Sequence, residues 1–186
     1  GKFRHGYGKM RYKNGNSYNG EWAYDTYQGR GTLHSKGSIY DGNFSDGEKH
    51  GTGIITFPDK SKFSGIWELD LPKSGTLITK NYDKVTGNFF DLDFKGKGTI
   101  EFINGDFYEG NYTKNIPTKK GKIYYKNRLI YEGNFKNGKR EGEGMLTYPN
   151  GDIYEGFFKY NLKEGYGQIR YKTGEIKEGL WQQDKF

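Results

Sequence analysis

The sequence predicts an all-β fold: an elongated, single-layer, twisted antiparallel sheet built from eight tandem β-hairpins. Three observations predict it: a glycine-centred motif recurs eight times, residue types alternate with the period of a strand, and short glycine-containing loops separate the alternating stretches. Composition agrees, because only 32% of the 186 residues are hydrophobic while 18% are aromatic. We therefore expect a core of rings rather than a thick aliphatic core.

The recurring motif is an aromatic residue, any residue, glycine, any residue and a second aromatic residue. Its clearest copies begin at Tyr18, Tyr40, Phe63, Tyr108, Tyr131 and Tyr154, and weaker copies begin at Val85 and Lys177. The central glycines lie 22 or 23 residues apart, and a Gly-x-Gly motif precedes each of them, with lysine in place of the first glycine at Lys73 and Lys119. Eight copies of two linked motifs in phase indicate a repeat protein.

The seventh copy shows how one repeat becomes a hairpin. A three-residue loop of Pro, Asn and Gly at 149–151 suits a type I turn followed by a left-handed glycine. This loop predicts that Leu146 faces Tyr154 and that Gly144 faces Gly156 on the same face of the sheet. Paired glycines leave bare backbone, so we expect aromatic rings to lie over it.

Applied to every copy, this register predicts one array over residues 1–186, a segment of a longer protein. The expected hairpins span about 6–22, 29–44, 51–67, 73–89, 96–112, 119–135, 142–158 and 165–181.

The sequence offers little for catalysis. It has no cysteine, and His5, His34 and His50 lie far apart without metal-ligand spacing. We predict no enzyme, no catalytic or metal site and no cofactor. We also predict no nucleic-acid partner, because no helical reading element is present and the rings are needed for packing. The net charge of +7 is compatible with an acidic partner.

The two linked motifs and their period resemble the MORN repeat (membrane occupation and recognition nexus), and the resemblance covers essentially the whole chain. It implies a non-catalytic scaffold that binds protein partners in a cytoskeletal, cortical or ciliary assembly inside the cell. Two alternatives stay open. One is a module that binds anionic phospholipid, such as phosphoinositide, and targets the protein to a membrane. The other is a regulatory array attached to an enzyme outside this segment.

For the scaffold function we expect an extended or helical partner segment to lie lengthwise along the ring-bearing face. The predicted partner groove consists of the motif aromatics: Tyr18, Trp22, Tyr40, Phe44, Phe63, Trp67, Phe89, Tyr108, Tyr112, Tyr131, Phe135, Tyr154, Phe158 and Trp181.

Two further surfaces are predicted. The lipid patch is the densest basic stretch: Lys114, Lys119, Lys120, Lys122, Lys126 and Arg128. The self-association patch gathers apolar residues of the last two hairpins on the face opposite the rings: Met145, Ile153, Phe157, Ile176 and Leu180. An exposed apolar patch of this size favours a homodimer through the C-terminal repeats.

Overall fold

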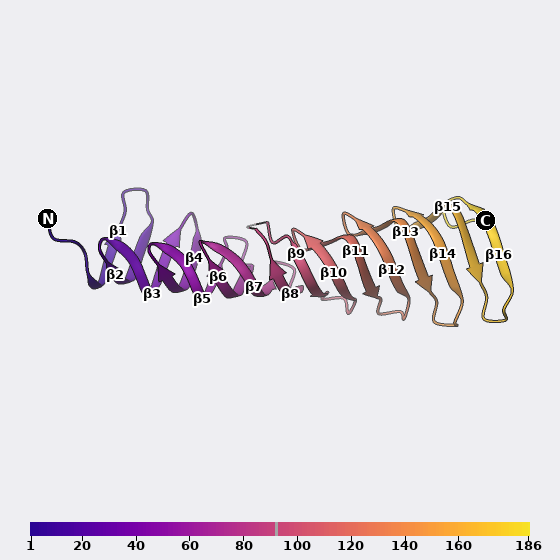
Figure 1. The fold of residues 1–186 in the computed structure, drawn as a ribbon, viewed down its shortest axis with the longest axis horizontal. Helices are drawn as coiled ribbons and strands as arrows, with labels where there is room; N and C mark the ends of the chain where they lie inside the picture. The colour runs from indigo at the N-terminus through magenta and orange to yellow at the C-terminus, as the bar shows by residue number, and fades with distance from the viewer. Residues whose placement is uncertain (92) are drawn as a thin grey trace. The chain divides into compact units, whose positions relative to one another are not determined.

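The computed structural model describes residues 1–91 and 93–186. These residues contain sixteen β-strands and no helix, and the strands follow one another in chain order (Figure 1). They form two compact units, Gly1–Phe94 and Lys95–Phe186. Within each unit, the described strands pair antiparallel with their chain neighbours, so each unit is an open single-layer sheet of four hairpins. The predicted all-β architecture of tandem hairpins is confirmed.

The first unit contains strands β1 to β8. Their bounds are β1 Gly6–Arg11, β2 Ser17–Ala23, β3 Thr26–Ser35, β4 Ser38–Ser45, β5 Glu48–Thr56, β6 Lys62–Glu68, β7 Leu71–Ile78 and β8 Lys84–Phe89.

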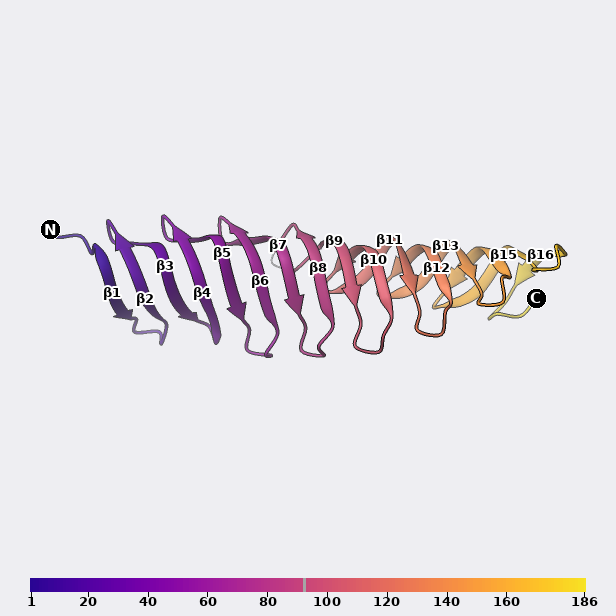
Figure 2. The ribbon, with the colours of Figure 1, turned by 90° about the horizontal axis from the view of Figure 1, so that it is seen from below.

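The second unit contains strands β9 to β16, and Figure 2 shows neighbouring strands side by side within each unit. Their bounds are β9 Gly96–Glu101, β10 Phe107–Thr113, β11 Ile116–Tyr124, β12 Ile130–Lys136, β13 Lys139–Thr147, β14 Ile153–Lys159, β15 Leu162–Arg170 and β16 Ile176–Trp181. The described part of the chain holds no helix long and apolar enough to cross a membrane.

The hairpin register matches the predicted pairs. Leu146 lies opposite Tyr154 and Gly144 lies opposite Gly156. Gly151 has the left-handed φ of +97° that the three-residue loop requires, and its amide closes the turn with a hydrogen bond of 3.0 Å. Loop chemistry therefore sets the register, and the register places the motif rings on one face.

Within each unit, successive hairpins are joined by two-residue turns in which both residues have positive φ, as at Tyr24 (+48°) and Asp25 (+68°). The strand that follows contains a bulge near the Gly-x-Gly motif. In five copies the first glycine of that motif takes a positive φ, for example +60° at Gly29, and Lys119 adopts +54° in the same position despite its side chain.

Each of four turns is also tied to the chain at or just before the start of a strand one repeat earlier. The side chain of the second turn residue accepts a hydrogen bond from a backbone N–H 21 positions earlier. The donor and acceptor pairs are Arg4 with Asp25 (2.8 Å), Lys49 with Asp70 (2.8 Å), Arg140 with Asn161 (2.8 Å) and Lys163 with Asp184 (2.7 Å). These hydrogen bonds hold the backbone of Arg4, Lys49, Arg140 and Lys163 in place, so that their side chains can lie over the ring face.

Candidate functional site

The structure buries all fourteen aromatic residues of the predicted partner groove, and none exposes more than 8% of its surface. They form a continuous chain of edge-to-face contacts within each unit. In the second unit, for example, Tyr131 contacts Phe135 at 5.1 Å and Phe158 at 5.0 Å between ring centroids. The rings are therefore the core of the sheet, and the residues that cover them form the outer surface of this face.

The glycine pairs explain why the rings lie so deep. A Cβ on Gly31 would stand 2.3 Å from the hydroxyl oxygen of Tyr18, so the ring lies directly on bare backbone. The hydroxyl of Tyr18 donates to the carbonyl of Glu21 at 2.8 Å. The predicted covering of paired glycines by rings is confirmed. Burial raises the pKa of Tyr18 to about 12, because the phenolate would lose its hydration.

A second periodic series covers the buried rings, and we call its members the slot residues. They are Arg4, Tyr27, Lys49, Pro72, Phe94, Pro117, Arg140 and Lys163, again 22 or 23 positions apart. Tyr27 stacks on Tyr18 at 3.9 Å between centroids, and Phe94 meets Phe63 at 5.5 Å and Phe89 at 5.3 Å. Each slot residue thus fills the space above the rings with another ring, a proline or a cation.

Four of the slots hold cations over ring faces. The guanidinium of Arg4 lies 4.3 Å from the Trp22 ring centroid, and Lys49 Nζ lies 5.6 Å from that of Tyr40. The guanidinium of Arg140 lies 5.6 Å from the ring centroid of Phe158. Such contacts stabilise a cation whose hydration is reduced.

A third series meets the slot residues from the opposite end of the strands. These rim residues, each just before a hairpin loop, are Tyr12, Phe57, Phe102, Tyr125, Tyr148 and Tyr171, and all are half-buried. The hydroxyl of Tyr27 donates to that of Tyr12 at 2.7 Å, and Arg140 Nη1 donates to the hydroxyl of Tyr125 at 3.1 Å. The rim residues and the five slot residues that are not buried (Arg4, Tyr27, Lys49, Arg140 and Lys163) therefore form the outer surface of the ring face.

Sequence reasoning missed both series. Their signal was available, because both recur with the period of the glycines. The periodic signal was hard to recognise because Arg, Lys, Tyr, Phe and Pro differ widely in hydropathy. All of these side chains can nevertheless pack on an aromatic face.

The opposite face of the second unit is hollowed into a shallow groove of about 1070 Å³ along the glycine rows of β10 to β15. Glutamates repeat along it, including Glu109, Glu132 and Glu155, and Lys120 and Lys122 lie at its basic end. Lys122 Nζ is 3.6 Å from Glu132 Oε2. This groove carries charge of both signs.

The six residues of the predicted lipid patch do not gather at one place. Lys114 lies in the turn before β11, whereas Lys126 and Arg128 lie in the loop after it. Because a strand rises about 3.3 Å per residue, the nine residues of β11 separate these groups by about 30 Å. Lys119 lies within β11, and Lys120 and Lys122 line the shallow groove.

The self-association patch lies on the face opposite the rings, with Phe157 44%, Ile176 54% and Leu180 74% exposed; Met145 is exposed and Ile153 is half-buried. Leu180 pairs with Tyr166, which is 55% exposed and extends the patch.

Comparison with other repeats shows that an apolar residue at position 157 loses a side-chain hydrogen bond. In three other repeats the equivalent residue is Asn43, Asn111 or Asn134, whose side-chain amide donates to a carbonyl of the next strand at 3.0–3.2 Å. Phe157 has no such donor. The sequence therefore replaces a stabilising hydrogen bond with exposed apolar surface at this position.

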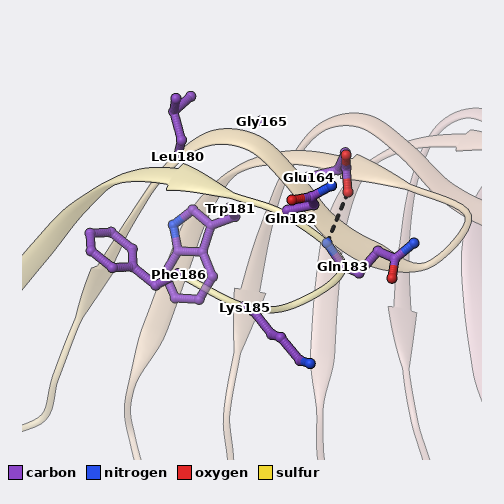
Figure 3. A pocket seen from close by; sticks show the side chains of 8 residues that line it. All are labelled: Glu164, Gly165, Leu180, Trp181, Gln182, Gln183, Lys185 and Phe186. Carbon is purple, nitrogen blue, oxygen red and sulfur yellow. Dashed lines mark hydrogen bonds between the residues drawn. The ribbon is translucent and has the colours of Figure 1, made fainter.

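At the end of the second unit, a depression of about 680 Å³ is lined by residues of β15, β16 and the segment after β16 (Figure 3). Phe186 packs on Trp181 at 5.2 Å between centroids, and its ring lies over Gly179. Lys177 stands where five other repeats carry tyrosine, and Phe186 supplies a ring at this place. Figure 3 shows Leu180 pointing away from these rings.

Solved structures of TCP10 domains are similar to this chain in fold. The TCP10 domain of Danio rerio CPAP matches with a TM-score of 0.50 and 12% identity, covering 92% of this chain and 82% of that one. The same domain in complex with a STIL peptide matches with a TM-score of 0.49 and 9% identity, covering 93% of this chain and 83% of that one. The Drosophila melanogaster SAS-4 TCP domain in complex with a proline-rich motif of Ana2 matches with a TM-score of 0.48 and 14% identity. The match covers 82% of this chain and 85% of that one. A search of curated proteins found no match.

The sequence model of the MORN repeat matches residues 1–17, 18–38, 40–62, 131–153 and 154–176, which together are more than half of the chain. The matched stretches contain the glycine pairs, covering rings and loop glycines described above. The resemblance inferred from the motifs is confirmed, and the chain belongs to the MORN-repeat family.

Proposed function

We propose that this chain is a non-catalytic, protein-binding scaffold module of a cytoskeletal, cortical or ciliary assembly. Its partner is an extended segment that lies along the ring-bearing face of a unit. The observation that carries the proposal is the row of slot and rim residues, in which partly exposed rings and cations recur along each unit, although the slot residues Pro72, Phe94 and Pro117 are buried. Membership of the MORN-repeat family, whose proteins include scaffolds, supports the same proposal.

The spacing of the row favours an extended segment over a helix. Two strands of a sheet occupy about 9.6 Å, so each repeat offers one slot at that interval. A polyproline II segment has three residues per turn and rises about 9.3 Å per turn, so every third side chain meets the next slot. An α-helix has a pitch of about 5.4 Å, which does not divide the interval evenly. Aromatic rows of this kind are suited to polyproline II ligands.

The test compares partner capture by three forms of the intact chain: wild type, a Tyr125→Ala, Tyr148→Ala variant of the rim, and a Glu132→Ala, Glu155→Ala control on the opposite face. Proteins bound from a lysate are identified by mass spectrometry. We expect the rim variant to lose the partners that wild type and control retain. Equal retention by all three, with melting temperatures unchanged, contradicts the ring face as the binding surface.

We propose self-association as a second property of the same chain, supported by the exposure of Phe157, Tyr166 and Leu180. One apolar patch can be self-complementary about a two-fold axis. Light scattering should give a dimer mass for wild type and a monomer mass for Phe157→Glu, Leu180→Glu. A wild type that stays monomeric at high micromolar concentration, or a variant that stays dimeric, contradicts this proposal.

A further inference from the structure

The four cationic slots differ in how their charge is balanced. In the first unit, the turn residue 21 positions later is an aspartate that neutralises the cation. Arg4 Nε lies 2.9 Å from Asp25 Oδ1, and Lys49 Nζ lies 3.6 Å from Asp70 Oδ1. Each of these cations therefore has a carboxylate partner within its own unit.

Arg140 occupies the same position in the second unit, but its turn residue is Asn161. Arg140 Nη1 donates to the Tyr125 hydroxyl at 3.1 Å, and Nη2 donates to the backbone carbonyl of Asn161. Its Nε, the atom that Arg4 uses to bond aspartate, is buried without a hydrogen-bond partner. Across residues 1–91 and 93–186, no carboxylate lies within ion-pair distance of this guanidinium.

The next slot also presents a cation. The backbone N–H of Lys163 donates to Asp184 Oδ1 at 2.7 Å, but its Nζ lies over rings, 4.9 Å from the Trp181 centroid and 5.4 Å from that of Tyr148. Among the described residues, no ion pair joins Nζ to a carboxylate. Two successive slots of the second unit therefore carry positive charge without a carboxylate partner.

We propose that Arg140, with Tyr125 beside it and Lys163 one repeat further on, recognises carboxylate side chains of an acidic extended protein segment. The inference rests on the proposed function and specifies the chemistry of the partner. Charged groups with reduced hydration are stable when they are paired, and a guanidinium binds a carboxylate through two parallel hydrogen bonds. The Tyr125 hydroxyl accepts from Arg140, so its own hydrogen is available to a carboxylate oxygen.

Charge complementarity and spacing together select this occupant. Slots about 9.6 Å apart correspond to three residues of a polyproline II chain, so acidic residues at positions n and n+3 would meet Arg140 and Lys163. An anionic membrane is a different occupant, and the test below separates the two.

The probe is a fluorescein-labelled peptide with the sequence Glu-Pro-Pro repeated five times, and its control replaces each Glu with Gln. Binding to the intact chain is measured by fluorescence anisotropy at low salt. The decisive variant is Asn161→Asp, which supplies in the second unit the carboxylate that Asp25 and Asp70 supply in the first. We expect it to weaken Glu-peptide binding roughly tenfold or more, because an internal carboxylate competes for Arg140.

Two variants complete the design. Asn137→Asp adds the same charge at the neighbouring turn, where Asn137 also has positive φ (+50°), and should leave the affinity within about twofold. Asp70→Asn removes the carboxylate from Lys49 and should strengthen peptide binding by opening a comparable slot. Asn161→Asp should fold, because aspartate already occupies this turn position at Asp25, Asp70 and Asp184, and its melting temperature should rise.

Three results would overturn the proposal: equal binding of the Gln peptide, unchanged affinity in Asn161→Asp, or an equal loss in Asn161→Asp and Asn137→Asp. Binding to phosphatidylserine vesicles without binding to the Glu peptide would assign the site to a membrane instead. The broader scaffold function is tested separately. If natural partners leave the rim variant but stay on Asn161→Asp, the scaffold stands and the acidic recognition fails.

Discussion

The contact between Tyr18 and Gly31 offers a direct measure of how tightly the repeats are packed. A Cβ added at Gly31 would lie 2.3 Å from the Tyr18 hydroxyl oxygen and 2.5 Å from two of its ring carbons. The ring cannot withdraw freely, because it packs against Trp22 at 5.0 Å and Phe44 at 5.4 Å between centroids. Gly31→Ala must therefore displace the ring or the strand.

The expected destabilisation follows from two effects. Overpacking of a well-filled core costs about 1–3 kcal/mol, and losing the bond from the Tyr18 hydroxyl to Glu21 costs about 0.5–1.5 kcal/mol. We therefore expect Gly31→Ala to lower the free energy of unfolding by about 2–4 kcal/mol. Gly8 is the matched control, because it occupies the same motif position and its added Cβ would lie 3.5 Å from Trp22 Nε1, an ordinary contact.

Urea unfolding of both variants, followed by tryptophan fluorescence, supplies the measurement. Gly8→Ala should stay within about 0.5 kcal/mol of wild type. The reasoning is refuted if Gly31→Ala is no less stable than Gly8→Ala, because the close approach of ring and glycine would then have no energetic consequence.

Three further predictions concern the effect of pH on stability, the binding of lipid and the indole hydrogen bond of Trp67. Burial raises the pKa of Tyr18 to about 12, above the value near 10 of an unfolded tyrosine. The stability that neutral Tyr18 contributes to the fold is therefore complete below about pH 10 and is lost as pH rises toward about 12. Melting temperatures measured from about pH 9 to about pH 12 should fall across this window. Reversing Lys119, Lys120 and Lys122 to Glu should abolish any low-salt binding to phosphoinositide vesicles, and binding that persists in the variant or at about 0.5 M salt contradicts the predicted patch. Trp67→Phe should cost about 0.5–1.5 kcal/mol in urea unfolding, because the indole N–H donates to a carbonyl of the neighbouring strand at 3.2 Å; an unchanged midpoint would show that this bond contributes nothing.

The hairpins and their register were predictable because their determinants are local. A glycine at 151 requires a left-handed turn, and the turn then forces Leu146 to face Tyr154. Period and residue type alone decide such contacts, so eight copies of the motif gave the fold class directly.

The proposed binding surface was not predictable in the same way. Sequence placed Tyr131 and Phe158 on one face correctly, but the burial of that face depends on residues from three different strands. Arg140 covers these rings because its backbone is tied to Asn161, 21 positions later. A hydropathy pattern assigns arginine to solvent, and only the tertiary contact shows that it closes the ring core.

The antiparallel pairing of chain neighbours has a mechanical consequence. Force applied along the chain to one end of a unit loads the outermost hairpin first, and its interstrand hydrogen bonds break one after another rather than together. Each released repeat of 23 residues adds about 80 Å of extended chain. A unit built in this way is expected to unfold hairpin by hairpin, while the hairpins that remain keep their ring packing.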